Sequence, residues 1–347
     1  MLTTYPRTLA ALLRISSRQA HASKLRNEWL DKGIAVPAYL IVSTTDDCNL
    51  QCKGCYSQDL RCDQGAKNAL SAKRVEEIVR EAYALGCSAF LLAGGEPLMA
   101  PAWMNSVARQ KGMLGLVFTN GTLINEEWLD FFDARRNMIA LFSLEGSAEL
   151  TELRRGKGVV EKIKSGMLAM RGRKIPFGIS VTTGKHNLAE VMQARFVEEY
   201  YDLGCRLVIH VEYVPTGDTT DFLPLSEKEK LELADYCGVM TETSGVIHIS
   251  FPGDESVFGG CLAAGRGFLH ISTSGSLEPC PFAPYSDSSL ADKSLLEAFQ
   301  SPLLAAVRAE AHTLREGIGG CSLRGKEDWL KDLTAQGSAV PCTQQTV

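Results

Sequence analysis

The sequence predicts an α/β fold built on a parallel sheet, and three observations lead to that prediction. Six short apolar runs, rich in β-branched residues, recur over residues 38–214. Helical patterns separate these runs, and such alternation is typical of a parallel sheet with helices outside it. After residue 245 the pattern changes to short strands with tight turns. We therefore expect an open doubly wound sheet or an incomplete barrel, followed by a small appended domain.

Composition excludes several classes of protein. The 347 residues are 45% hydrophobic and 22% charged, which is typical of a globular protein. The net charge of -5 argues against a nucleic-acid partner, because such proteins usually carry a basic face. No apolar run is long enough for a membrane span, and the N-terminus lacks the pattern of a signal peptide. The 11 cysteines are therefore expected in the cytoplasm, where thiols bind metal more often than they form disulfides.

The elements follow in order along the chain. Residues 1–36 predict a basic amphipathic helix, which can lie on a membrane surface but more commonly packs against the protein's own core. Helices are also predicted over 71–86, between an N-capping Ser71 and Gly86, and over 187–204. The expected strands of a core domain at 37–245 are 38–44, 88–94, 114–120, 138–144, 177–183 and 206–214. The appended domain, 246–347, is expected to contain a hairpin that turns at Ser274 and Gly275.

A loop with three cysteines follows the first predicted strand. Cys48, Cys52 and Cys55 are separated by three and two residues. Thiolates are soft ligands that select zinc, copper or iron-sulfur clusters. A structural zinc site needs a fourth ligand, and Cys62 lies seven residues further on in a different local context. Three ligands on a four-iron cluster would instead leave one iron open to a small molecule.

This loop, together with the aromatic Tyr56 that follows it, resembles the motif of radical S-adenosylmethionine (SAM) enzymes. The resemblance implies a 4Fe-4S cluster whose open iron binds the amino and carboxylate groups of SAM. It also implies that an electron from the cluster cleaves SAM to a 5'-deoxyadenosyl radical, and that a flavodoxin or ferredoxin supplies the electron. Of the two folds left open above, it favours the partial (β/α)6 TIM-like barrel.

The resemblance assigns SAM contacts to residues at the ends of later strands. Gly94, Gly95 and Glu96 are similar to the family segment that contacts the methionyl amino group, although alone this run is an ordinary turn. The other implied contacts are Asn120, Ser143 and Glu145 for the ribose, Arg155 for the carboxylate and Val214 for the adenine. By themselves these residues are equally typical of turns, helix starts, surface and core.

The C-terminal cysteines resemble a second cluster site. Cys261 and Cys280 flank the hairpin at Gly275, as in the SPASM and twitch extensions of this family, where the hairpin supplies two ligands of an auxiliary 4Fe-4S cluster. Cys321 is the expected third ligand and Cys342 a possible fourth. The chain lacks the dense cysteine run of a full SPASM domain, so one auxiliary cluster is the maximum. Zinc or buried thiols remain alternatives.

The expected function is that of a radical SAM oxidoreductase or peptide-modifying enzyme, which removes a hydrogen atom from a peptide, protein or small-molecule substrate. A peptide or protein side chain is the first choice of substrate, for oxidation, cross-linking or epimerisation, and a tetrapyrrole side chain is the second. Cys62 and Cys237 are candidate hydrogen donors to a substrate radical, although a free cysteine without that role is the preferred interpretation. A noncatalytic iron-sulfur or zinc protein remains the alternative from another class.

Overall fold

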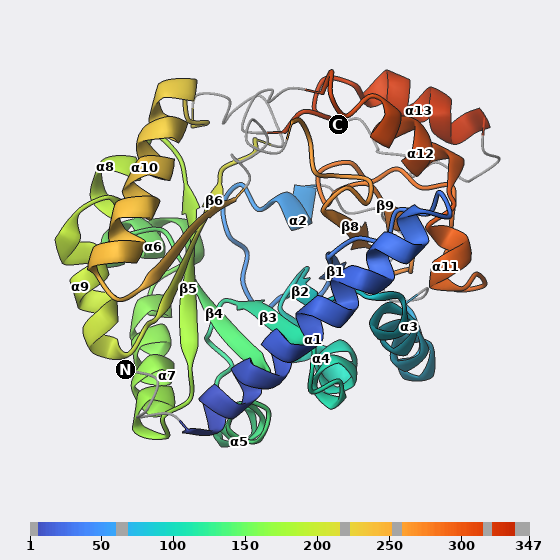
Figure 1. Cartoon of the computed structure of the whole chain (residues 1–347). Coiled ribbons are helices and arrows are strands. Elements are labelled where there is room, and N and C mark those ends of the chain that lie inside the picture. Colours follow the sequence, from blue (N-terminus) through green and yellow to red (C-terminus); the bar gives the residue numbers. More distant parts are fainter. Residues whose placement is uncertain (1–5, 60–68, 216–222, 252–258, 315–320, 337–347) are drawn as a thin grey trace.

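The strands of the protein form one parallel sheet, seen in the computed structural model of Figure 1, which describes residues 6–59, 69–215, 223–251, 259–314 and 321–336. Within these residues the sheet has nine strands in the order β7-β6-β5-β4-β3-β2-β1-β8-β9, and only the β8–β9 pair is antiparallel. The strands are β1 (Tyr39–Ser43), β2 (Ala89–Ala93), β3 (Leu114–Thr119), β4 (Met138–Leu144), β5 (Phe177–Thr183), β6 (Leu207–Glu212), β7 (Ile247–Phe251), β8 (Phe268–Ile271) and β9 (Leu277–Glu278).

Most of the helices lie outside the sheet, whereas the short α2 lies toward the middle of the ring of strands (Figure 1). The helices are α1 (Pro6–Leu30), α2 (Tyr56–Asp59), α3 (Ala72–Leu85), α4 (Pro101–Arg109), α5 (Glu126–Ala134), α6 (Ala148–Arg155), α7 (Val159–Gly172), α8 (Leu188–Val191), α9 (Ala194–Leu203), α10 (Glu227–Thr243), α11 (Leu295–Ala298), α12 (Pro302–Ala309) and α13 (Glu327–Gln336). Ser71 caps α3 and Gly86 ends it with a φ of 104°, as predicted. The predicted helix 187–204 is instead divided into α8 and α9. None of the described helices is long and apolar enough to span a bilayer.

The sheet curls into an incomplete barrel. β7 and β8 stand far apart in the strand order, yet the rings of Phe251 and Phe268 are in contact, with centroids 5.8 Å apart. The two sides of the sheet therefore approach each other, which confirms the predicted barrel over the open sheet. All six predicted core strands are present. β7 and β8 had been expected in the appended domain, but they pair with β6 and β1 and widen the main sheet.

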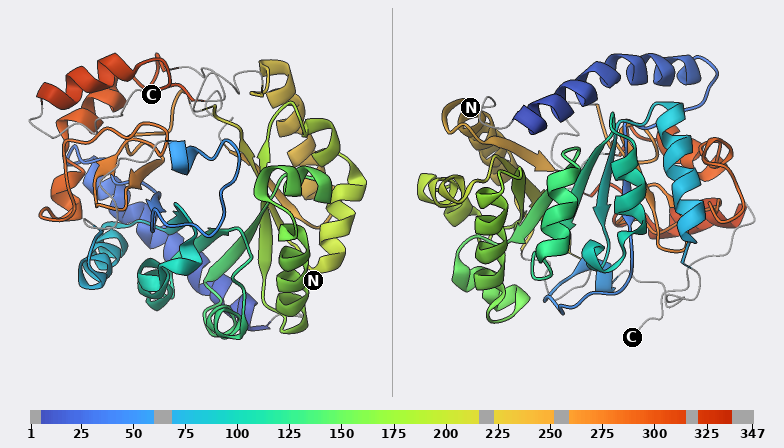
Figure 2. Two further views of the ribbon diagram at one scale, coloured as in Figure 1. Left: turned by 180° about the vertical axis from the view of Figure 1, so that it is seen from behind. Right: turned by 90° about the horizontal axis from the view of Figure 1, so that it is seen from below.

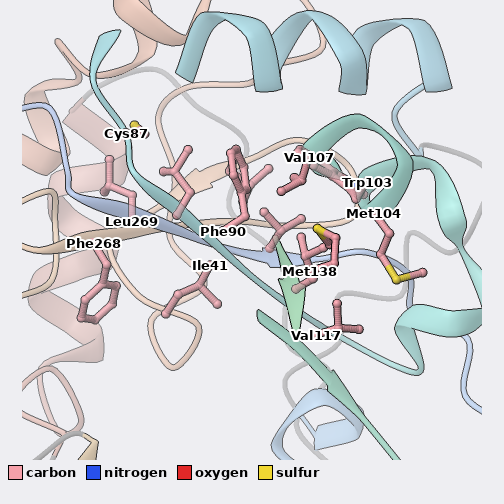
Figure 3. Close-up of a cluster of buried hydrophobic side chains, with 14 of the residues drawn as sticks. Ile41, Cys87, Phe90, Trp103, Met104, Val107, Val117, Met138, Phe268 and Leu269 are labelled. Carbon is pink, nitrogen blue, oxygen red and sulfur yellow. The ribbon is translucent and has the colours of Figure 1, made fainter. Parts of the chain in front are cut away.

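The main core lies between the sheet and its surrounding helices. Figure 3 shows Phe90 of β2 beside Trp103, Met104 and Val107 of α4, with Met138 of β4 next to them. All five side chains are at most 4% exposed. Burial of such large apolar side chains stabilises each by about 1.5–3 kcal/mol relative to exposure, so this layer fixes α4 against the strands.

α1 crosses the connections that lead into β2, β3 and β4 (Figure 2). Arg18 donates to the carbonyl of Tyr83 at 2.6 Å and Arg26 to that of Gly86 at 2.7 Å, and Arg7 pairs with Asp133. The helix thus packs on the protein's own body, which was the preferred prediction. Its buried residues are Thr8, Ala11, Ile15 and Ala22, whereas Leu12 and Leu13 are exposed.

Candidate functional site

The three-cysteine loop runs from β1 to α2, at the carboxyl end of the parallel strands. Cys48, Cys52 and Cys55 are half-buried, and none of them forms a disulfide. Burial raises the pKa of Cys48, and the neighbouring Glu96 and Cys55 raise it further. Burial also raises the pKa of Cys52, against the opposing effect of Arg155 and Arg154. Because their pKa values are raised, these thiols ionise only when a positive charge lies beside them. A bound metal centre supplies that charge.

Arg154 fastens this loop to α6. Its Nε donates to the carbonyl of Lys53 at 3.1 Å and its Nη2 to that of Gly54 at 3.2 Å. The amide of Lys53 donates in return to the carbonyl of Arg154. From the sequence, both Arg154 and Arg155 are candidates for the SAM carboxylate, with Arg155 preferred. Nothing in a pair of adjacent arginines shows which one reaches a loop 100 residues away.

Glu145 holds both arginines in place. Its Oε1 accepts from Arg154 at 2.7 Å and from Arg155 at 2.6 Å, and the side chain is 1% exposed. Its Oε2 is buried and has no hydrogen-bond partner among the described residues. Glu145 thus anchors the arginines, and Oε2 is the atom left for the ribose contact that the resemblance implies.

We expect Arg154→Lys to lower the free energy of unfolding by about 2 kcal/mol, because hydrogen bonds from charged groups contribute about 1.5–3 kcal/mol. Lysine keeps the positive charge near Cys52. Its single ammonium group cannot donate at the same time to the carbonyls of Lys53 and Gly54 and to the carboxylate of Glu145, as the planar guanidinium does. Urea unfolding measures the change. Arg173→Lys is the matched control, because Arg173 also pairs with two acids, Glu126 and Asp130, but on the surface. An equal loss in both variants would contradict the role of Arg154.

Gly94 and Gly95 hold the other side of the loop. The amide of Gly95 donates to the carbonyl of Thr45 at 2.7 Å, and that of Glu96 to the carbonyl of Asp47 at 2.8 Å. A Cβ on Gly95 would lie 2.0 Å from the carbonyl oxygen of Asp47, so only glycine permits this approach. The glycines predicted to lie near SAM therefore also position the segment that leads to Cys48.

Glu96 and Asn120 connect three strand ends. The carboxylate of Glu96 accepts from Thr119 Oγ1 at 2.7 Å, from the Asn120 amide at 2.8 Å and from the Leu98 amide at 3.0 Å. Burial raises the pKa of Glu96, although these bonds oppose the shift. The side-chain nitrogen of Asn120 donates to Asn49 and lies 3.9 Å from the sulfur of Cys48. Both predicted residues thus meet at the cysteine loop.

Tyr213 and Val214 follow β6 and are buried. A Cβ on Gly54 would lie 2.8 Å from the Tyr213 hydroxyl, so the ring packs directly on the cysteine loop. That hydroxyl is buried and has no partner among the described residues. Ser143 is half-buried on β4 and stands in register with Ser180 of β5. The adenine and ribose contacts predicted for Val214 and Ser143 remain predictions.

One of the C-terminal cysteines, Cys280, lies near Tyr56 at the end of the cysteine loop. The hairpin between β8 and β9 turns at Gly275 with a φ of 90°, as predicted, and Cys261, Cys280 and Cys321 are buried. Cys55 and Cys280 both raise the pKa of Tyr56, after the larger effect of burial. Tyr56 therefore stands near both of these cysteines. Cys62 and Cys342 lie outside the described residues.

The structure also shows polar residues that no motif indicated. His270 of β8 lies 2.9 Å from the Ser43 hydroxyl through Nε2 and 2.6 Å from Glu278 through Nδ1. His270 and Glu278 are each 5% exposed. The triplet depends on the pairing of β8 with β1, which sequence does not reveal. Cys237, a predicted hydrogen donor, lies on α10 within a small apolar cluster that includes Leu188, Leu225 and Leu233, and is not among the cysteine loop's neighbours described above.

Comparisons with known proteins agree with this geometry. A model of the radical SAM superfamily matches residues 42–197. The AdoMet-dependent heme synthase of Methanosarcina barkeri is 25% identical over 318 residues, which are 83% of this chain and 89% of that protein. A cysteine-type anaerobic sulfatase-maturating enzyme of Clostridium novyi is 27% identical over 165 residues, 42% of this chain and 44% of that protein.

A solved structure shares the fold. Streptococcus suis SuiB bound to its precursor peptide SuiA superposes with a TM-score of 0.66 at 16% identity, over 88% of this chain and 74% of that one. The matched segment 42–197 contains Cys48, Cys52 and Cys55 and five of the six core strands in part or whole. The chain therefore carries a radical SAM domain, of the superfamily that binds a 4Fe-4S cluster and S-adenosylmethionine.

Proposed function

We propose that this protein cleaves SAM reductively and uses the resulting radical to remove a hydrogen atom from a substrate held at the mouth of the barrel. The observation that carries the proposal is the loop of Cys48, Cys52 and Cys55, fixed at the end of β1 by Arg154 on one side and Gly95 on the other. When bound, the cluster and SAM supply the electron and the 5'-deoxyadenosyl radical.

The residues present suit these groups. Three thiols in one short loop would hold a four-iron cluster and leave one iron for SAM. Arg154 and Arg155 offset the negative charge at Cys52. Two buried oxygens without a partner among the described residues, Tyr213 Oη and Glu145 Oε2, belong to side chains that contact this loop directly or through Arg154. Such unsatisfied atoms are expected where a polar ligand completes the site.

The chain's own residues would bind and orient SAM. Glu96 Oε2 accepts one bond from Asn120 and retains a lone pair for the methionyl ammonium. Arg155 would bind the carboxylate, Ser143 and Asn120 the ribose, and Val214 the adenine. Tyr56 would shield the cluster, since it lies between Cys55 and the ring of Phe282, 5.0 Å away.

Cys261, Cys280 and Cys321 would hold one auxiliary 4Fe-4S cluster. The burial of all three and the place of Cys280 near Tyr56 support this assignment, because a second cluster near the first can accept an electron from the substrate radical or hold the substrate. Cys342 stays a candidate fourth ligand. Cys62 stays a candidate hydrogen donor, and a flavodoxin or ferredoxin a candidate electron donor.

A tetrapyrrole side chain is now the better supported substrate. The heme synthase relative matches most of both chains, whereas the sulfatase-maturating relative matches less than half of each. The peptide first expected from the sequence is the second candidate, supported by that maturating enzyme and by the fold shared with SuiB. Both substrates would use the same radical chemistry.

Anaerobic reconstitution with iron and sulfide, followed by reduction with dithionite in the presence of SAM, tests the proposal. We expect release of 5'-deoxyadenosine and a change in the electron paramagnetic resonance spectrum of the reduced cluster when SAM is added. A reduced cluster that leaves SAM intact, or zinc in place of iron and sulfide, would show a noncatalytic protein. Mass spectrometry of an added iron coproporphyrin, in parallel with a cysteine-containing peptide, then separates the two substrates.

A further inference from the structure

The outer face of β6 and β7 carries a second group of metal-ligating side chains, outside the SAM site. Side chains alternate along a strand, so His210 of β6 points to the same face as Val208, and Val208 stands in register with His248 of β7. α10 lies beside β6 on this outer side of the barrel (Figure 1) and presents Cys237. Three elements thus bring two imidazoles and one thiol together.

The distances suit one metal ion. One ring nitrogen of His210, one of His248 and the sulfur of Cys237 all lie within 4.8 Å of one another. Nε2 of His210 is 3.4 Å from Nδ1 of His248. Two nitrogens bound tetrahedrally to zinc at about 2.0 Å are themselves about 3.3 Å apart. The same 3.4 Å is long for a hydrogen bond between two nitrogens, so the imidazoles satisfy each other poorly.

The hydrogen bonds around His210 leave a nitrogen directed at its neighbour. Nδ1 of His210 lies 3.4 Å from the hydroxyl of Thr183, and that hydroxyl donates to the carbonyl of Val181. The hydroxyl oxygen is then the acceptor for an Nδ1 proton on His210, which leaves the Nε2 lone pair free to bind a metal. A hydrogen-bond partner on the second nitrogen is the usual way in which proteins orient a ligating histidine, and at 3.4 Å the contact with Thr183 is a weak one.

The cluster is buried and incompletely satisfied. His210, His248 and Cys237 are 0%, 6% and 5% exposed. The hydroxyl of Tyr236, whose ring stands edge-on to both imidazoles, has no hydrogen-bond partner among the described residues. Nε2 of His248 also lacks one, but zinc bound at Nδ1 would not satisfy that nitrogen. Buried polar atoms without partners are rare in proteins and frequently indicate an ion or water.

The protonation states of the three side chains are also those that metal binding requires, namely neutral imidazoles and a thiol that can lose its proton to a bound cation. Burial lowers the pKa of His210 to about 3 and that of His248 to about 4, so both imidazoles are neutral near pH 7. Burial raises the pKa of Cys237 to about 12, so the thiol ionises only when a cation is bound beside it. Metal binding would therefore release a proton from Cys237.

We propose that His210, Cys237 and His248 bind one zinc ion that joins α10 and the edge strand β7 to β6. Imidazole and thiolate ligands together favour zinc over magnesium or calcium, which prefer oxygen. The three side chains leave a fourth position, and the phenol oxygen of Tyr236 is a neighbouring donor that has no other partner in the described part of the chain. The site is independent of the SAM chemistry, and neither needs the other to be correct.

Metal analysis of matched variants tests this site. The full chain, with its clusters reconstituted, is dialysed anaerobically against zinc buffered by a weak chelator, and zinc and iron are counted per chain. We expect one zinc that is lost in His248→Gln and in Cys237→Ser, with iron unchanged. Cys205→Ser is the matched control, because Cys205 is also buried at the edge of the sheet but lies outside the three-residue cluster. It should keep the zinc.

A second measurement covers variants that fail to fold. Cobalt added to the wild-type chain should give the visible bands of a tetrahedral ion and a charge-transfer band from one thiolate, and X-ray absorption of the zinc form should show two nitrogens and one sulfur. Zinc that persists in both variants, absorption dominated by several sulfurs, or no zinc in the wild-type chain would each overturn the site, whether or not SAM is cleaved.

Discussion

Cys52→Ala is expected to reduce the formation of 5'-deoxyadenosine by about 100-fold or more, since even the outer-shell partners of metal ligands cost about 10–100-fold when they are replaced. Cys52 supplies one of the three thiolates of the proposed cluster and lies next to Arg154 and Arg155. Without its sulfur, the two remaining cysteines leave two irons without protein ligands. The measurement is the amount of 5'-deoxyadenosine formed by reconstituted protein under dithionite.

The control for this variant is Cys87→Ala. Cys87 is 1% exposed in the core beside β2, and burial raises the pKa of its thiol to about 12, as expected for a packing residue. Its loss should leave both iron content and 5'-deoxyadenosine unchanged. Equal activity in Cys52→Ala and the wild-type protein would refute ligation by the loop, and equal inactivity of the two variants would show a general loss of folding.

Gly95→Ala should be the most damaging of the glycine substitutions around the loop. The new Cβ would meet the carbonyl of Asp47 at 2.0 Å, and since that atom belongs to the backbone, the segment before Cys48 must shift. We expect a loss of about 3 kcal/mol or more in the free energy of unfolding, the upper range for overpacking. The shift would also remove the bond from Glu96 to Asp47 and reduce the iron content.

Gly172→Ala provides the comparison, because nothing lies within 4 Å of the Cβ that it would add at the end of α7. Alanine is the better helix former, so this variant should be as stable as the wild-type protein or slightly more so. Chemical denaturation of both variants, with iron analysis of each, measures the difference. A Gly95→Ala protein with normal stability and normal iron would show that the loop does not depend on the close approach.

Local patterns predicted much of this fold. Each apolar run became a strand, and Ser71 and Gly86 bound their helix as expected, because these signals act over a few neighbouring residues. The place of β7 at one edge of the main sheet, and that of β8 between β1 and β9, did not follow from sequence. Their partners, β6 and β1, lie at different distances along the chain, and period and composition are the same whichever strand they join.

The same limit applies to the site. The spacing of Cys48, Cys52 and Cys55 is a local pattern and indicated the chemistry. Which side chains support the loop depends on nonlocal contacts, as the pairing of Arg154 with Lys53 and Gly54 shows. His210, Cys237 and His248 are separated by 26 and 10 residues and form no motif, so only the register of β6 and β7 and the docking of α10 unite them.

The contact between Phe251 and Phe268 has a consequence for access to the barrel. It joins β7 and β8 through ring atoms, and in the strand order these two strands share no hydrogen-bonded ladder. An aromatic pair contributes only about 0.5–1.5 kcal/mol beyond its buried area. Among the described residues no interstrand hydrogen bond joins β7 to β8, so the barrel wall can open between these two strands more easily than the wall of a fully closed barrel.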